Sequence, residues 1–206
     1  MTACTLRHYI NLVESVGAWS DFPIRSFDAL YHVGSMNRLR KQKISFEGSG
    51  LSVSLHPNVW RYIDGGWVHG DLWRLVKDGN QFVDINAMTQ QNREAVIAWA
   101  EQKGYLRRAK VGTNGVTGQS ALWDRLGGML PMPDHAFDLA LTVYLEDETG
   151  IDGVWWDEPL VVAPKTKGGW APRGVIFVSR LPQWKIERIS ETEAPDLDLF
   201  SKKRRR

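Results

Sequence analysis

Apolar and polar residues alternate in a short stretch in the first third of the chain. Residues 51–55, Leu-Ser-Val-Ser-Leu, place an apolar side chain at every second position, which is the period of a half-buried β-strand. Residues 29–33 form an apolar run around His32 and are followed by Gly34, a pattern typical of a strand that leads into a tight turn. We therefore expect a histidine-bearing strand and a serine-bearing strand to present polar side chains to one cleft.

The other regular elements are predicted from apolar spacing and from residues that start or stop helices. Thr89 is a suitable N-cap for a helix over residues 92–103, and Gly104 is a suitable stop. A second helix is predicted from Pro133 to about residue 146. Strands are predicted over residues 151–158, 174–178 and 184–189, and a short helix over residues 59–63.

Three further predictions rest on local signals. Asp78-Gly79-Asn80 lies between two alternating runs, residues 71–77 and 81–85, and a D-G turn in this setting predicts a β-hairpin. Residues 5–16, and a segment that ends near residue 30, have the spacing of two short helices. Residues 105–128 are rich in glycine and indicate a loop. Four basic residues in it either contact an acidic or phosphorylated target or face solvent: Arg107, Arg108, Lys110 and Arg125.

The order of these elements favours an α+β fold. Strands outnumber helices and do not alternate regularly with them, which argues against a doubly wound sheet. A length of 206 residues suits one domain, and we expect residues 1–190 to form it, with a helical N-terminal lead-in. Residues 191–206 turn acidic and then basic, and we expect them to be a disordered tail.

Charge and cysteine content exclude several classes of protein. Five of the 26 Lys and Arg residues occupy positions 202–206, which leaves 21 against 24 acidic residues, so a generally basic nucleic-acid binder is not indicated. The single cysteine, Cys4, excludes an intramolecular disulfide and a thiolate metal cluster. No apolar run approaches the roughly 20 residues that span a bilayer, and the five histidines lack metal-site spacing. We expect a cytoplasmic protein, bacterial or in a phage-infected host cell, without a metal or a membrane partner.

The order of the motifs resembles the ADP-ribosyltransferase superfamily, in the branch whose sequences open with a Y-H-G-[ST]-like motif. The matching residues are Tyr31-His32-Val33-Gly34-Ser35, then Gly50 to Trp60, and then a late strand that carries Asp157 and Glu158. The resemblance implies the superfamily's fold, two packed mixed β-sheets around an NAD cleft with flanking helices. It also implies NAD as a substrate and a macromolecule as the acceptor.

The implied reaction depends on a carboxylate. Transfer of ADP-ribose breaks the bond between nicotinamide and ribose C1′ through a transition state that resembles an oxocarbenium ion, so a fixed negative charge nearby is useful. By resemblance, Glu158 is the catalytic carboxylate, and His32 is the second expected catalytic residue. Asp157 is the second candidate for the carboxylate role. Neighbours on a strand face opposite sides, so Asp157 and Glu158 would not both face the cleft. The alternative is that both are exposed charges at a strand end.

The remaining site residues would hold NAD. By resemblance, the ring of His32 binds ribose hydroxyls and the backbone near Gly34 holds the nicotinamide amide. Either serine of residues 51–55 would bind ribose or phosphate. Family members often have tyrosine where this chain has Ser52, so an aromatic residue of the next helix would provide the stacking surface for nicotinamide. The expected cofactor-binding set is Tyr31, His32, Gly34, Ser52, Ser54, Trp60 and Tyr62.

The function expected from the sequence is therefore NAD-dependent transfer of ADP-ribose, as in bacterial toxins or phage-encoded modifiers of host machinery. A protein acceptor is favoured over a nucleic acid. Two alternatives within the enzymes are NAD hydrolysis and RNA 2′-phosphotransfer, and the latter needs additional basic residues around a phosphate. A third alternative is a protein of the same fold that binds or inhibits a partner without catalysis.

Overall fold

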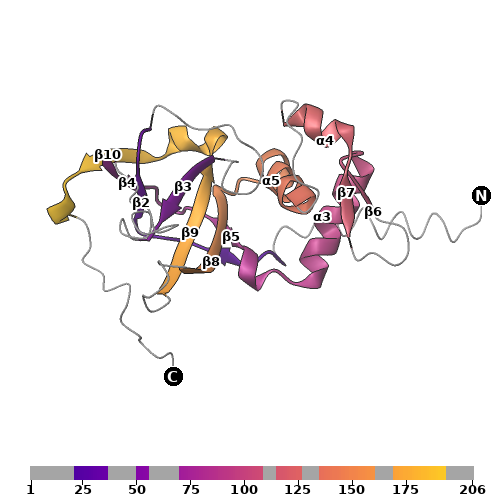
Figure 1. Cartoon of the computed structure of the whole chain (residues 1–206), viewed down its shortest axis with the longest axis horizontal. Helices are drawn as coiled ribbons and strands as arrows, with labels where there is room; N and C mark the ends of the chain where they lie inside the picture. The colour runs from indigo at the N-terminus through magenta and orange to yellow at the C-terminus, as the bar shows by residue number, and fades with distance from the viewer. Residues whose placement is uncertain are drawn as a thin grey trace, which may run out of the picture.

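The computed structural model describes residues 21–36, 50–55, 70–108, 115–126, 135–160 and 169–193. Eight strands within these ranges form one curled sheet (Figure 1). The pair β5–β8 is parallel, and the other pairs are antiparallel. In the order in which they lie side by side, the strands are β1 (Ile24–Arg25), β5 (Phe82–Asp84), β8 (Gly153–Leu160), β9 (Gly169–Phe177), β3 (Gly50–Ser54), β2 (Leu30–Val33), β4 (Leu72–Val76) and β10 (Lys185–Ile189).

This architecture confirms the α+β class. Instead of two packed sheets, the described residues form the single eight-stranded sheet and a separate pair, β6 (Leu106–Arg108) and β7 (Val116–Gly118). The sheet is continuous because β3 pairs with β9 on one side and with β2 on the other. The second of these ladders is short, with Tyr31 opposite Ser54 as its one registered pair.

Three helices lie to one side of the sheet in Figure 1: α3 (Gln90–Gln102), α4 (Ser120–Arg125) and α5 (Ala136–Glu148). Helix α5 lies next to β8 and β9, and α4 lies beyond α5 from the sheet. Thr89 caps α3 as expected: its side chain accepts from the N–H of Asn92, while the Asn92 side chain accepts from the N–H of Thr89. Gly104 ends the helix with a φ of +72°, a conformation that glycine adopts without strain. The predicted helix boundaries here are confirmed to within two residues.

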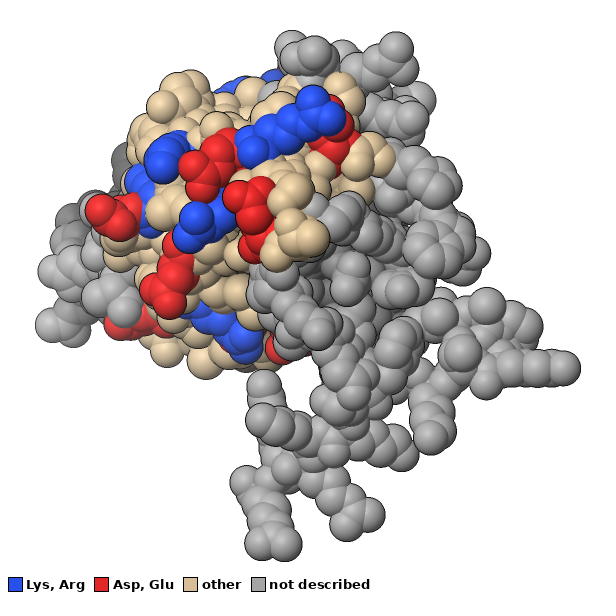
Figure 2. Space-filling view, turned by 90° about the vertical axis from the view of Figure 1, so that its left-hand side faces the viewer, with Lys and Arg blue, Asp and Glu red and all other residues tan. Residues whose placement is uncertain are grey.

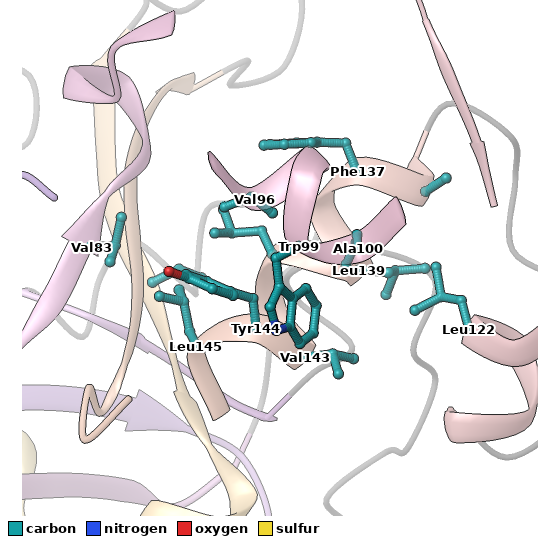
Figure 3. Close-up of a cluster of buried hydrophobic side chains, with 14 of the residues drawn as sticks. Val83, Val96, Trp99, Ala100, Leu122, Phe137, Leu139, Val143, Tyr144 and Leu145 are labelled. Carbon is teal, nitrogen blue, oxygen red and sulfur yellow. The ribbon is translucent and has the colours of Figure 1, made fainter. Parts of the chain in front are cut away.

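The two faces of the sheet bury two hydrophobic clusters. Along β8, Val154 and Trp156 face the helices, and Trp155 faces the other side. The helix-side cluster includes Trp99, Val143 and Tyr144 (Figure 3). The cluster on the other face, the inner cluster, consists of Leu30, Leu51, Val53, Leu75, Phe82, Trp155, Ile176, Leu181 and Trp184. The alternation in residues 51–55 therefore predicted the burial of Leu51 and Val53 correctly, but Ser54 on the other face is also buried.

The hairpin predicted around Asp78-Gly79-Asn80 is wrong. The chain does turn there, with Gly79 at a φ of +65°, but β4 pairs with β2 and β10, whereas β5 pairs with β1 and β8. Asn80 explains the divergence, because its buried side chain bonds the N–H and C=O of Phe27 and the C=O of Lys77. These bonds fix the turn against the segment between β1 and β2.

Other local predictions also change. The segment that ends near residue 30 contains the short strand β1 instead of a helix, since Asp84 N–H donates to Pro23 and Arg25 pairs with Phe82. The glycine-rich interval 105–128 contains β6, β7 and α4. The strand predicted over 174–178 begins earlier, at Gly169. Short 3₁₀ turns cover Ile85–Ala87, Val178–Gln183 and Glu191–Glu193.

Two predicted helices, over residues 5–16 and 59–63, lie outside the described residues, as does the chain after residue 193. Among the helices that the structure describes, none is long and apolar enough to cross a bilayer.

Candidate functional site

His32 is fixed by a hydrogen bond to the neighbouring strand. Its Nδ1 lies 2.8 Å from the backbone carbonyl oxygen of Ser52. A carbonyl oxygen only accepts, so Nδ1 carries the proton. Burial lowers the pKa of His32 below its ordinary 6.5, and the Ser52 bond opposes part of this shift. The ring is therefore neutral at pH 7, with Nε2 as an acceptor suited to a ligand hydroxyl.

Gly34 lies directly beside this acceptor. Its φ is +140°, and a methyl group on its Cα would come within 3.1 Å of His32 Nε2. A side chain here would both strain the backbone and crowd the imidazole. The local sequence H-V-G thus leaves Nε2 uncovered by its own turn.

Strand β4 and Asp71, the residue just before it, hold both polar groups of the Gly34 backbone. The N–H of Gly34 donates to the carbonyl of Asp71 over 2.9 Å, and its carbonyl accepts from Trp73 Nε1 over 2.9 Å. Trp73 is also the residue opposite His32 in the β2–β4 ladder. Gly70 packs so closely that a Cβ on it would lie 2.7 Å from Gly34 Cα. The turn after His32 is therefore set by β4 as well as by its own sequence.

The serines do not share a face with His32. Tyr31 and Ser54 are opposite each other and lie on one face, and both are buried. Ser52 is two positions from Ser54 on that same face and is half-buried. His32 alternates to the other face, that of the inner cluster. It reaches Ser52 through the backbone carbonyl instead of the hydroxyl.

Strand β8, which carries Glu158, is separated from β2 by β3 and β9. Three strand spacings of about 4.8 Å lie between them along the curve of the sheet. Next to the Tyr31–Ser54 pair, the strand register places His32 opposite Val53, Val53 opposite Gly174, and Gly174 opposite Trp155. These four residues form one row across the sheet. Val53 and Trp155 are completely buried in the inner cluster. Packed side chains therefore occupy His32's face between it and β8.

Glu158 is placed by its backbone, opposite Ala171 and three residues beyond Trp155 along β8. Its side chain lies outside what the structure describes, as do Trp60 and Tyr62 entirely. Of the predicted site residues, the structure brings together His32, Gly34 and the backbone of Ser52, and it pairs Tyr31 with Ser54 on the other face of the sheet.

Asp157 belongs to a different polar cluster, which lies at the carboxyl end of β5 and the middle of β8. Arg25 Nε lies 2.7 Å from Asp84 Oδ2, and its other nitrogen is 3.7 Å from Asp157 Oδ2. The Asp157 N–H donates to Asn86 Oδ1 over 2.8 Å. This reserve carboxylate is therefore held by β1 and by the segment after β5, away from the row of His32.

Arg173 is a basic residue just before the strand predicted over residues 174–178. It lies on β9, opposite both Ser54 and Trp156, and its guanidinium is 5.6 Å from the centre of the Trp156 ring. Tyr31, Ser54, Arg173 and Trp156 thus form a row on the face opposite His32. No sequence signal marked it, because the strand pairing alone creates the row.

Two of the four basic residues of the interval 105–128 form ion pairs within the protein. Arg108 pairs with Glu94 and Glu101, and Arg125 pairs with Asp147. Arg107 is exposed, and Lys110 lies outside the described residues. Two of these cations are therefore neutralised within the protein, which favours the solvated-surface interpretation for them.

The side of the sheet that ends in β10 also mixes charges. Glu187 contacts Arg74 and Lys185, and Arg188 contacts Asp71. Figure 2 shows this face with basic and acidic groups interspersed over it. Where the structure describes the chain, no group of three or more metal-ligating side chains occurs.

No protein-family model matches the chain, and neither a curated protein nor a solved structure gives a significant match to it.

Proposed function

We propose that this protein binds NAD at the end of β2 and transfers its ADP-ribose group to a macromolecule, as the resemblance to the ADP-ribosyltransferase superfamily implies. The supporting observation is that His32 and Ser52 come from neighbouring strands and are joined by the bond from Nδ1. This bond leaves Nε2 as an acceptor for a ribose hydroxyl. Gly34 places no side chain against Nε2.

The carboxylate role is assigned to Glu158. It would stabilise positive charge at ribose C1′ as the nicotinamide bond breaks, or take a proton from the acceptor. Because Val53 and Trp155 fill the row between His32 and β8, NAD would not cross the sheet along that row. The ligand would have to reach Glu158 around the outer part of β8.

One experiment separates the enzymatic outcomes. The protein is incubated with NAD labelled in the adenylate phosphate, together with bacterial lysate, and compared with His32→Ala and Glu158→Gln. Label on a macromolecule supports transfer, and free ADP-ribose without labelled macromolecule supports hydrolysis. Loss of labelling in Glu158→Gln with NAD binding retained supports the assigned roles. Full labelling by Glu158→Gln and loss in Asp157→Asn would move the carboxylate role to Asp157.

The buried row between His32 and β8 favours one alternative, a protein that binds a partner without catalysis. In that case the wild type would leave NAD intact, in buffer and in lysate. NAD binding measured by calorimetry then distinguishes a nucleotide-regulated binder from a protein that does not use NAD.

A further inference from the structure

We infer that Trp73 is a positioning residue of the His32 site and sets its affinity for the nucleotide. This inference rests on the proposed NAD-dependent function and extends it to a residue on β4 that the sequence motifs do not include. Trp73 is the direct cross-strand neighbour of His32, and its indole N–H donates to the carbonyl of Gly34 over 2.9 Å.

The geometry lets Trp73 orient the peptide group between Gly34 and Ser35, because Trp73 bonds the carbonyl of that group. The N–H of Gly34 already donates to Asp71 over 2.9 Å, so the Trp73 bond is the second of two that hold the Gly34 backbone to β4. Glycine has the widest conformational freedom of any residue, and without the indole bond the carbonyl of Gly34 can rotate. Gly34 lies beside His32 Nε2, since a Cβ on Gly34 would be 3.1 Å from that nitrogen. A rotation of the Gly34 backbone therefore changes the surroundings of Nε2.

The same bonds alter one expectation from the resemblance. If the backbone near Gly34 held the nicotinamide amide, the N–H of Gly34 would be needed for that contact, but it is bonded to Asp71. The carbonyl of Gly34 keeps a second lone pair, since a carbonyl oxygen accepts two hydrogen bonds. The Gly34 carbonyl is therefore the group available to an amide N–H of the ligand, and Trp73 orients that carbonyl.

A pair of matched substitutions tests this role. Trp73→Phe removes the indole donor beside Gly34, and Trp99→Phe removes a comparable donor in the helix-side cluster, where Trp99 Nε1 bonds Glu148. Loss of one neutral hydrogen bond at the site is expected to raise the KM for NAD about five- to tenfold in Trp73→Phe, with kcat within about twofold. Trp99→Phe is expected to leave both within about twofold.

A second measurement does not depend on turnover. Hydrogen exchange at the Gly34 amide, followed by NMR, is expected to be about tenfold faster in Trp73→Phe and unchanged in Trp99→Phe. If Trp73→Phe does not fold, benzothienylalanine at position 73 removes the N–H and keeps the ring shape.

The outcomes separate the two proposals. An absence of NAD binding by the wild type would remove the proposed function, and Gly34 exchange would then decide alone whether Trp73 holds the turn. Unchanged exchange overturns the positioning role whatever the kinetics. Faster exchange with an unchanged KM overturns the link to nucleotide affinity.

Discussion

The imidazole of His32 and the backbone carbonyl of Ser52 are joined by a 2.8 Å hydrogen bond that connects β2 to β3 next to their one registered pair, Tyr31–Ser54. A side chain therefore replaces part of the backbone ladder at this point of the sheet. The bond therefore links the protonation state of His32 to the stability of the contact between β2 and β3.

Mild acidification is expected to weaken the fold through His32. Its pKa in the folded chain is lowered by burial, so between that value and 6.5 the unfolded chain binds a proton that the folded chain does not. The free energy of unfolding then falls as the pH drops below about 6.5, and this effect is absent above it. Urea denaturation at about pH 7.5 and pH 5.5 measures the loss, which should be smaller in His32→Gln. Asp138 is half-buried, and because burial raises its pKa it acts in the opposite direction. Equal losses in the two proteins would assign the pH dependence to other groups.

Lys77→Met is expected to destabilise the protein by about 3–5 kcal/mol, because it leaves a buried charge without its partner. Lys77 Nζ lies 2.5 Å from Asp152 Oδ1, and the Asp152 side chain is only 2% exposed. Arg74→Met is the matched control, since the two side chains of its pair with Glu187 are 45% and 33% exposed and a surface pair of this kind contributes little. Urea denaturation at pH 7 compares the two. Similar small losses for both would show that water reaches Asp152.

Gly34→Ala is expected to cost about 1–3 kcal/mol and to reduce NAD binding. The cost arises from its φ of +140°, and the reduced binding arises because the new methyl lies 3.1 Å from His32 Nε2. Gly150→Ala is the control, since a Cβ there meets nothing within 4 Å, and its effect should be neutral or slightly stabilising. Thermal unfolding and calorimetry with NAD check both effects. A Gly34→Ala protein with wild-type stability and binding would contradict the geometry of this turn.

Asn80→Ala is expected to cost about 2–4 kcal/mol. The side chain is buried and bonds the N–H and C=O of Phe27 and the C=O of Lys77, and its removal leaves these groups unsatisfied. Asn80→Asp keeps the acceptor for the Phe27 N–H but turns a buried carboxylate oxygen toward the carbonyls of Phe27 and Lys77, so it should cost at least as much as Asn80→Ala. Chemical denaturation ranks the three proteins. A cost below about 1 kcal/mol for Asn80→Ala would mean that the turn does not depend on these contacts.

Local sequence signals predicted individual helices, strands and turns better than they predicted which strands pair with each other. The alternation in residues 51–55 and the Thr89 cap are read within a few residues, and both agree with the structure. The D-G turn at Gly79 was also read correctly as a turn, but the sequence carries no signal for which strands lie beside β4 and β5. That choice depends on Asn80 and Asp152, whose partners are as many as 75 residues away.

The candidate site shows the same division. The H-V-G motif identified His32 and Gly34, but not the strand that holds them, because Trp73 acts through one indole N–H on a backbone carbonyl. Placing Ser52 and Ser54 in one cleft with His32 failed for a geometric reason. Paired residues on neighbouring strands point to the same face of the sheet, and successive residues point to opposite faces. His32 follows Tyr31, which is paired with Ser54, so its side chain points to the face opposite Ser54 and Ser52.

The ladder between β3 and β9 has a consequence for how the chain is made. It joins residues 50–54 to residues 173–177, so the middle of the sheet is assembled from segments far apart in the sequence. Such contacts close a long loop before they yield any stabilisation, which slows folding. A nascent chain that has not yet emerged past Phe177 lacks β9, the strand that lies between β3 and β8. Until β9 is made, β3 and β8 have an unpaired edge and exposed apolar side chains, which a chaperone could recognise.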